Sequence, residues 1–282
     1  LGVSLKTVNT SSALIEVVKN PAHGYGSEVN PCLDCRIMMF REAREYMDEV
    51  GAEFLVTGEV LGERPMSQRR EAMDLIEKEA DVEGLVVRPL CARHIEPSIP
   101  EKRGWVDREK LLDIRGRNRT PQIELAEEYD INDYPCPAGG CRLTDPGFAA
   151  RMRDLMRHRR DFGVNDVQLL TVGRHFRLSE DTRAVVGREE EENTRLWSLR
   201  QEGDLLFQLE NYTGPTTLLR GRHEDKKLRI SATLTARYAN IESTDGVSVR
   251  VLDEPEQARD TLTVEPAGPE EYRHLMVTPD NN

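Results

Sequence analysis

Residues 30–68 read NPCLDCRIMMFREAREYMDEVGAEFLVTGEVLGERPMSQ, and this stretch decides the fold class of the first half of the chain. Cys32 and Cys35 open a helical run, and a short apolar strand follows it with Gly58 at its carboxyl end. A helix that is followed by a strand and a glycine-rich loop indicates half of a nucleotide-binding α/β unit. Because open α/β sheets bind ligands outside the carboxyl ends of their strands, we expect a site at this rim.

The helix in this stretch is predicted by apolar residues at helical spacing and by Gly51, which favours a stop. The spacing is carried by Met39, Ala43, Met47 and Val50. Further strands are expected over residues 3–8, 54–57 and 84–90, and further helices over 11–19, 70–80 and 122–129. Strands that alternate with helices predict a parallel sheet.

The pattern changes after about Phe162, where a smaller α+β domain is expected. Strands are predicted over residues 167–172, 184–186, 205–209 and 247–251, and helices over 189–200 and 228–238. The last residues are rich in Glu, Pro and Asp, which is typical of a loosely packed tail. The expected domains are therefore residues 1–160, residues 163–252 and an acidic tail over 253–282.

Composition limits the classes of function. The 282 residues carry a net charge of −12, which argues against binding a polyanion through the field of the whole molecule. Arginines nevertheless gather in residues 115–119 and 151–160, where they can hold an RNA backbone locally or form a solvated helix face. No run of eighteen apolar residues exists, which excludes a transmembrane helix. The five cysteines do not resemble a secreted disulfide framework, so a cytoplasmic setting is expected.

Four of the five cysteines form two close pairs, Cys32 with Cys35 and Cys136 with Cys141. Three or four thiolates brought together suit an iron–sulfur cluster or zinc, whereas isolated buried thiols are merely structural. Glycines before Cys141 leave its sulfur accessible. Cys91 follows a strand alone and reads as a small core residue.

Several runs resemble the catalytic domain of tRNA 4-thiouridine synthetases, a group of PP-loop ATP pyrophosphatases. These runs are RIMMFREA (36–43), TGEVLGERPMSQ (57–68) and VRPL (87–90). The longer string from HGYGSEVNPCLDC (23–35) through GWVDREKLLDIRGRNRTPQIELA (104–126) to CPAGGCRLTDP (136–146) is similar to a branch of this group. In that branch, a domain of the tRNA-thiolation type is fused to one similar to the NFACT RNA-binding domain.

The second domain carries the likeness to the NFACT domain in VGRHFR (172–177), VGR (186–188) with Glu192-Asn193, Gly214-Pro215 and TARY (235–238). The fold implied by the two resemblances is an incomplete Rossmann-like sheet of the adenine nucleotide alpha hydrolase type, followed by the smaller α+β domain.

The first resemblance implies that Arg36, Gly58 and Gln68 hold ATP with Mg²⁺. Between Gly58 and Gln68 the chain is one residue longer than the family pattern. The PP-loop motif Ser-Gly-Gly-x-Asp-Ser is absent from the 282 residues. The first residues have neither an initiator methionine nor a signal peptide, so the motif is expected to precede Leu1, and the chain alone is expected not to turn over ATP.

The reaction implied for the full-length protein is thiolation of tRNA: ATP adenylates a uridine oxygen, and a sulfur then displaces AMP. Cys32, Cys35 and Cys141 are the implied ligands of a [4Fe–4S] cluster, with zinc as the alternative, and Cys141 and Cys136 are the candidate catalytic thiols. Sulfur would come from a cysteine desulfurase or from sulfide. Two alternatives stay open: a PP-loop ligase or amidase with structural zinc, and a non-catalytic RNA-binding scaffold.

We expect the second domain to bind tRNA through basic side chains, with a homodimer kept as an option. The residues expected at the RNA are Arg174, His175, Arg177, Arg188 and Arg237. The alternative is that these arginines pair with the abundant glutamates and only solubilise the domain.

Overall fold

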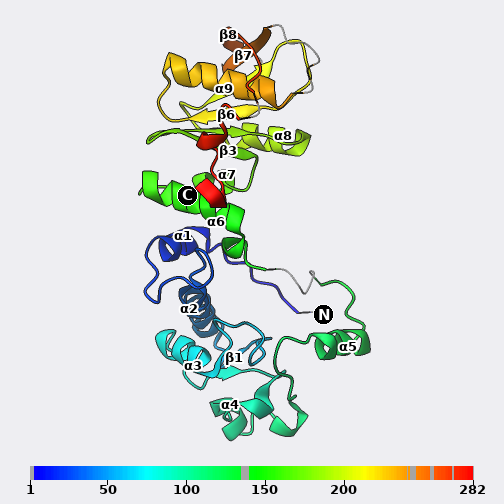
Figure 1. The fold of residues 1–282 in the computed structure, drawn as a ribbon. Coiled ribbons are helices and arrows are strands. Elements are labelled where there is room, and N and C mark those ends of the chain that lie inside the picture. The colour runs from blue at the N-terminus through cyan, green and yellow to red at the C-terminus, as the bar shows by residue number, and fades with distance from the viewer. Residues whose placement is uncertain are drawn as a thin grey trace. The chain divides into compact units, whose positions relative to one another are not determined.

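The structure is a computed structural model that describes residues 3–134, 140–239, 241, 246–254, 257–268 and 270–281. The chain divides into two compact units, Leu1–Cys141 and Arg142–Asn282 (Figure 1). Packing assigns the arginine-rich segment 151–160 to the second unit, whereas the sequence analysis placed it in the first domain.

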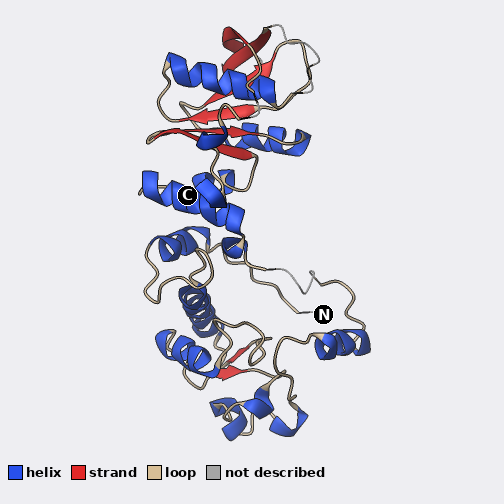
Figure 2. Ribbon diagram, in the orientation of Figure 1, coloured by secondary structure: helices blue, strands red, loops and turns tan. Residues whose placement is uncertain are grey.

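The first unit is mainly helical (Figure 2). Its described elements are α1 (Ser11–Lys19), α2 (Cys32–Val50), β1 (Leu55–Val56), α3 (Arg70–Glu79), β2 (Val86–Val87), α4 (Ile99–Lys102) and α5 (Thr120–Glu128), with 3₁₀ turns η1 (Ala92–His94) and η2 (Arg108–Lys110). The strands β1 and β2 pair in parallel, with Leu55 opposite Val86. Residues 3–8 are irregular rather than a strand, so the predicted parallel sheet is present only as this pair among the residues that the structure describes.

The helix α2 begins and ends near the predicted residues, but of the predicted face only Met47 is buried. Gly51 takes a left-handed conformation (φ 69°) and ends the helix, as expected. Ile37 and Phe40 are buried against Ile76 of α3 and Val86 of β2, whereas Met39 is exposed. Packing against α3 and the strands determines which face of α2 is buried. The spacing of apolar residues along the helix alone does not show which elements pack against it.

The second unit is an α+β domain around a six-stranded sheet. Its described elements are η3 (Arg142–Thr144), α6 (Pro146–His158), α7 (Val164–Leu169), β3 (Arg174–Ser179), β4 (Thr182–Val186), α8 (Glu190–Leu199), β5 (Leu205–Leu209), β6 (Thr217–Arg220), α9 (Asp225–Arg237), β7 (Val247–Glu254), β8 (Gln257–Val264), η4 (Arg273–Leu275) and η5 (Pro279–Asn281). The strand order is β3-β4-β6-β5-β7-β8, and all neighbours are antiparallel.

Both faces of this sheet are covered, because side chains alternate between two cores along each strand. Phe207 and Leu219 belong to the core that includes Ala232 of α9. Their chain neighbours Leu206 and Leu218 belong to the core that includes Leu196 of α8. The predicted order, a mixed α/β part followed by an α+β part, is confirmed in this coarse form.

Two predictions for the second unit differ from the structure. Residues 167–172 were expected as a strand, but residues 164–169 form α7, whose start is fixed by Asp166 accepting a hydrogen bond from the Gly163 N–H at 3.2 Å. Residues 253–282 were expected as a loose tail, but β8 pairs with β7 along the sheet. Beyond it, Met276 bridges to Phe176 of β3.

Within the described ranges, no helix has the length and apolar character needed to cross a membrane.

Candidate functional site

The predicted thiol site begins at the first turn of α2. Cys32 and Cys35 are partly exposed there, one turn apart, and the Sγ of exposed Cys141 lies 3.8 Å from the Asn30 Oδ1. The pKa of the Cys35 thiol is raised, first by burial and then by the thiols of Cys141 and Cys32. The three sulfurs therefore share one electrostatic neighbourhood.

Among the residues that the structure describes, no three His, Cys, Asp or Glu side chains are arranged to hold a metal ion. Cys136, the fourth member of the two pairs, lies outside the described residues. The cluster and the catalytic roles of Cys136 and Cys141 stay predictions. Cys91 is buried, and its Sγ donates to the Glu59 carbonyl at 3.3 Å, which fits the expected core role.

The residues predicted to hold ATP lie around the loop that follows β1. Arg36 pairs with the buried carboxylate of Glu59, the residue next to Gly58. A Cβ at Gly58 would meet no atom within 4 Å, so space is open beside its backbone. Gln68 is buried, and its Oε1 accepts a hydrogen bond from the Arg64 N–H at 2.9 Å. Gln68 thus closes its own loop, and the assignment of these residues to ATP stays a prediction.

A buried charge network at the ends of β1 and β2 was missed by the sequence analysis. The Arg88 Nε donates to Glu59 at 3.0 Å, and the same guanidinium pairs with Glu77. Glu59 comes after β1 and Arg88 follows β2 directly. Opposite charges that follow two neighbouring parallel strands were the signal that could have revealed the pair, since such strand ends meet at one edge.

The five residues predicted to contact RNA fall into different environments. Arg174 and Arg237 meet at one ring, with their guanidinium carbons 4.5 and 5.2 Å from the Tyr238 centroid. Arg188 pairs with Glu192, a glutamate as in the alternative, whereas Arg177 pairs with an aspartate, Asp154, so both charges have a near carboxylate.

His175 is buried in the sheet, with its Nε2 2.9 Å from the Val172 carbonyl oxygen. Its pKa lies well below the usual value, because burial, followed by the charges of Arg151 and Arg183, disfavours the imidazolium. This burial argues against the predicted contact of His175 with RNA.

The strongest concentration of positive charge in the second unit is α6 with its flanks. Residues 142–160 contain six arginines and two aspartates. The helix begins where the Asp145 side chain accepts a hydrogen bond from the Phe148 N–H at 2.6 Å, with Pro146 in the first turn.

One side of α6 buries Phe148, Met152 and Leu155, so helical spacing directs Arg153 and Arg157 away from that side, and Arg160 follows two residues after the helix ends at His158. Arg157 and Arg160 are exposed, and neither has an ion-pair partner within the described part of the chain. We call Arg153, Arg157 and Arg160 the α6 arginine face.

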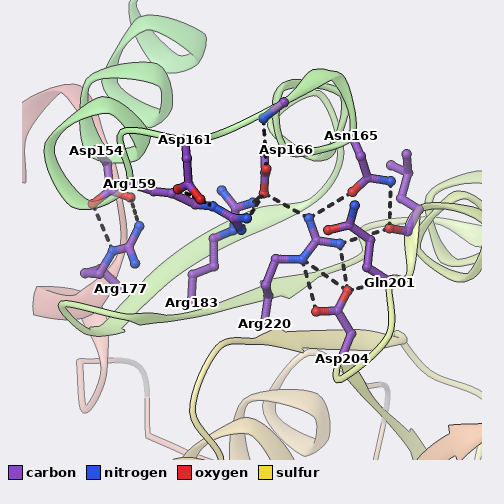
Figure 3. Close-up of polar contacts among 12 residues, drawn as sticks. Asp154, Arg159, Asp161, Asn165, Asp166, Arg177, Arg183, Gln201, Asp204 and Arg220 are labelled. Atoms are coloured by element: carbon purple, nitrogen blue, oxygen red, sulfur yellow. Dashed lines mark hydrogen bonds and ion pairs between the residues drawn. The ribbon is translucent and has the colours of Figure 1, made fainter.

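A buried ion network lies beside the carboxyl end of α6 (Figure 3). Asp166 of α7 accepts from the Arg183 Nη2 at 2.7 Å and from the Arg220 Nη1 at 3.1 Å. Arg220 also forms a fork with Asp204, at 3.0 and 2.6 Å. Burial alone would raise the pKa of Asp166, but Arg183, the Gly163 N–H, Arg159 and Arg220 together lower it.

The network borders a cavity of about 270 Å³. Its lining residues are Leu155, His158, Arg159, Arg177, Glu180, Asp181, Arg183 and Arg220. Of these residues, only Arg177 and those of the segment 151–160 were predicted as candidates from the sequence. The pairs that build the cavity are far apart in the sequence, and so the local pattern carried no signal for them.

Comparison with known proteins bears on the second unit. The sequence model of a family described as NFACT protein RNA binding domain matches residues 173–276, which include all six strands of the larger sheet. The predicted likeness of the C-terminal part to this domain is confirmed, and it extends past residue 252 to β8 and η4.

Among solved structures, the chain is similar to the C-terminal part of the fibronectin/fibrinogen-binding protein from Streptococcus suis. The identity is 11%, the likeness covers 57% of this chain and 79% of that chain, and the TM-score is 0.33. A TM-score of this size carries no argument here. No curated protein sequence matches the chain.

Proposed function

We propose that the second unit binds RNA and that the α6 arginine face contacts the phosphate backbone. The observation that carries the proposal is the exposure of Arg157 and Arg160 without carboxylate partners among the described residues, in a chain whose net charge is −12. Residues 173–276, which contain the sheet of the same unit, match an RNA-binding family, and this match also supports the proposal.

Geometry favours a backbone contact over base readout. Residues 153 to 157 cover about 6 Å along the helix, at 1.5 Å per residue, and Arg160 comes just after the helix end, which suits neighbouring phosphates on one strand. Phosphate contacts position a nucleic acid without reading its sequence, and they release counterions, so the affinity should fall steeply with salt.

The test is titration of the full chain with tRNA and with an unstructured RNA at two salt concentrations. Replacing Arg153, Arg157 and Arg160 together by Gln should raise the Kd at least tenfold at low salt. It should also reduce the slope of log K against log salt by about 0.7–0.9 for each phosphate that the variant no longer neutralises.

The matched control replaces three exposed arginines elsewhere in the unit, Arg195, Arg229 and Arg259, by Gln. This variant has the same net charge as the first and should keep the wild-type Kd to within about threefold. Equal weakening in the two variants would show that only overall charge matters, and the α6 face would be rejected as the contact.

RNA thiolation is a second candidate, favoured by one observation in the first unit. Burial, followed by the thiols of Cys141 and Cys32, raises the pKa of Cys35, and the charge of Arg36, predicted to hold ATP, acts on the same thiol in the opposite direction. A nucleotide at Arg36 and a sulfur at these thiols would then be neighbours, with tRNA supplied by the second unit and sulfur by a cysteine desulfurase or sulfide. The absorption spectrum of the anaerobically purified chain tests the cluster: Cys32→Ser should abolish a cluster signal that Cys91→Ser retains.

A further inference from the structure

The cavity beside α6 contains a buried cation with an unsatisfied donor. Arg183 is 5% exposed, its Nη2 binds Asp166, and its Nη1 has no acceptor among the described residues. A buried polar group without a partner destabilises the fold, and more so when it is charged. An oxygen that enters the cavity would supply the acceptor that this nitrogen lacks.

The charges around Arg183 point to an anion. The pKa of Arg183 is lowered to about 10, chiefly by burial, while Arg220 and Arg177 lower it further and Asp166 opposes them. The guanidinium stays protonated at neutral pH and lies among other guanidiniums. A neutral acceptor would satisfy the hydrogen bond alone, whereas an anion would also relieve the repulsion among the arginines.

The acidic residues near the cavity are engaged except exposed Glu180 on its wall, whose carboxylate has no ion-pair partner among the residues that the structure describes. Asp154, Asp166 and Asp204 are held by Arg177, Arg183 and Arg220 (Figure 3). On the cavity wall, Asp181 accepts from the Ser179 hydroxyl at 2.7 Å and lies 3.4 Å from the Lys227 Nζ. The fourth guanidinium, Arg159, has a side chain 43% exposed and only long contacts, 3.3 Å to Asp161 and 3.5 Å to Asp166. Arg159 can therefore turn toward an incoming anion at little cost.

We propose that this cavity binds a phosphate group of the RNA, held by Arg183 from within and by Arg159 at the mouth. The inference rests on the proposed RNA binding and deepens it. Leu155 and His158 line the cavity from α6, and Arg159, the residue that follows the helix, lines it next to Arg160 of the α6 arginine face, so the two sites adjoin at the carboxyl end of the helix. The phosphate is either an internal phosphodiester or a terminal monoester, and the experiment separates the two.

Inorganic phosphate is the first probe, because it tests the cavity without RNA. A ligand that binds only the folded state raises Tm with its concentration. At constant ionic strength, phosphate should raise the Tm of the full chain above its value in chloride. Arg159→Gln should abolish this increase, whereas Arg195→Gln, exposed on α8 and outside the cavity lining, should keep it. No phosphate effect on the wild-type chain, or an equal effect in the two variants, would overturn the proposal.

Arg183→Lys is the second variant, because it keeps the charge beside Asp166 and removes the orphaned Nη1. We expect a folded protein without the phosphate effect. A folded Arg183→Lys that keeps the full effect would overturn the role of Nη1, and if this variant unfolds, Arg159→Gln decides alone.

RNA supplies the second probe. A 5′-phosphorylated oligonucleotide and its 5′-hydroxyl form are compared, with Arg159→Gln beside the wild type. A preference of at least threefold for the phosphorylated form that disappears in Arg159→Gln assigns a terminal phosphate. Equal binding of the two forms with a weaker Kd in Arg159→Gln assigns an internal one, and no change in Kd for either form overturns the proposal. Failure of the α6 triple variant to weaken RNA binding would instead reject the proposed function, while the inorganic phosphate result would stand by itself.

Discussion

His175 shows at the scale of one residue how a polar side chain in a basic motif becomes part of the core. Its neighbour Phe176 is buried toward α9, and His175 is buried on the other face of β3, near Val172. A strand with one solvated face alternates buried and exposed side chains. Helices cover both faces of this sheet, so polar side chains of β3 are not all exposed. The motif VGRHFR therefore looked like a basic surface in the sequence and is only partly one in the structure.

The buried imidazole makes a prediction about pH. The pKa of folded His175 lies well below 6.5, so between that value and pH 6.5 the unfolded chain binds a proton that the folded chain does not. The contribution of neutral His175 to the free energy of unfolding is fully present above pH 6.5. Below pH 6.5 the free energy of unfolding should decrease on acidification, by up to about 1.4 kcal/mol per pH unit for one group.

The measurement is urea unfolding of the full chain at pH 7.5, 6.5 and 5.5. His175→Gln should lose part of the acid-induced destabilisation, whereas exposed His274→Gln should follow the wild-type curve. The same pH dependence in all three proteins would show that His175 does not carry it.

At the scale of elements, the turn after β6 has a strict steric requirement. Gly221 has φ +119°, and a Cβ there would lie 2.0 Å from the Asp181 carbonyl oxygen. Gly203 also has a positive φ, +84°, but a Cβ there meets nothing within 4 Å. Comparing substitutions at the two glycines therefore separates the cost of backbone strain from the cost of a steric clash.

Gly203→Ala should lower the free energy of unfolding by about 1 kcal/mol through strain alone. Gly221→Ala should lower it by about 3 kcal/mol or more, because strain is joined by a clash with backbone that cannot move away. Chemical denaturation of both variants measures the difference, and similar decreases would contradict the role assigned to the Asp181 carbonyl.

The elements that could be predicted were those whose own residues show helical periodicity or an apolar run. The helices over 189–200 and 228–238 and the strands over 184–186 and 205–209 had clear periodicity or apolar runs, and the structure has them. Residues 167–172 formed a short apolar run, which periodicity cannot assign to a strand or a helix. The strand β8 is almost wholly exposed, and backbone pairing with β7 holds it, so its composition resembled a tail.

At the scale of the whole molecule, long-range ion pairs explain why the candidate site could be predicted only in part. Charge density identified the arginines of residues 151–160 and Arg177. It could not show that Arg220 reaches Asp166, 54 positions away, or that Arg183 lacks one acceptor among the residues that the structure describes. Such pairs depend on which strands become neighbours, and no local pattern encodes that choice.

The bridge between Phe176 and Met276 has a consequence for how this unit can be used in larger proteins. The Val277 N–H donates to the His175 carbonyl at 2.9 Å, so the segment that holds the six-stranded sheet starts and finishes at one place. A segment with adjoining ends can be placed within a surface loop of another protein without stretching either partner. The same segment can be circularly permuted, with residues 175 and 277 joined and the new termini placed in a turn on the surface.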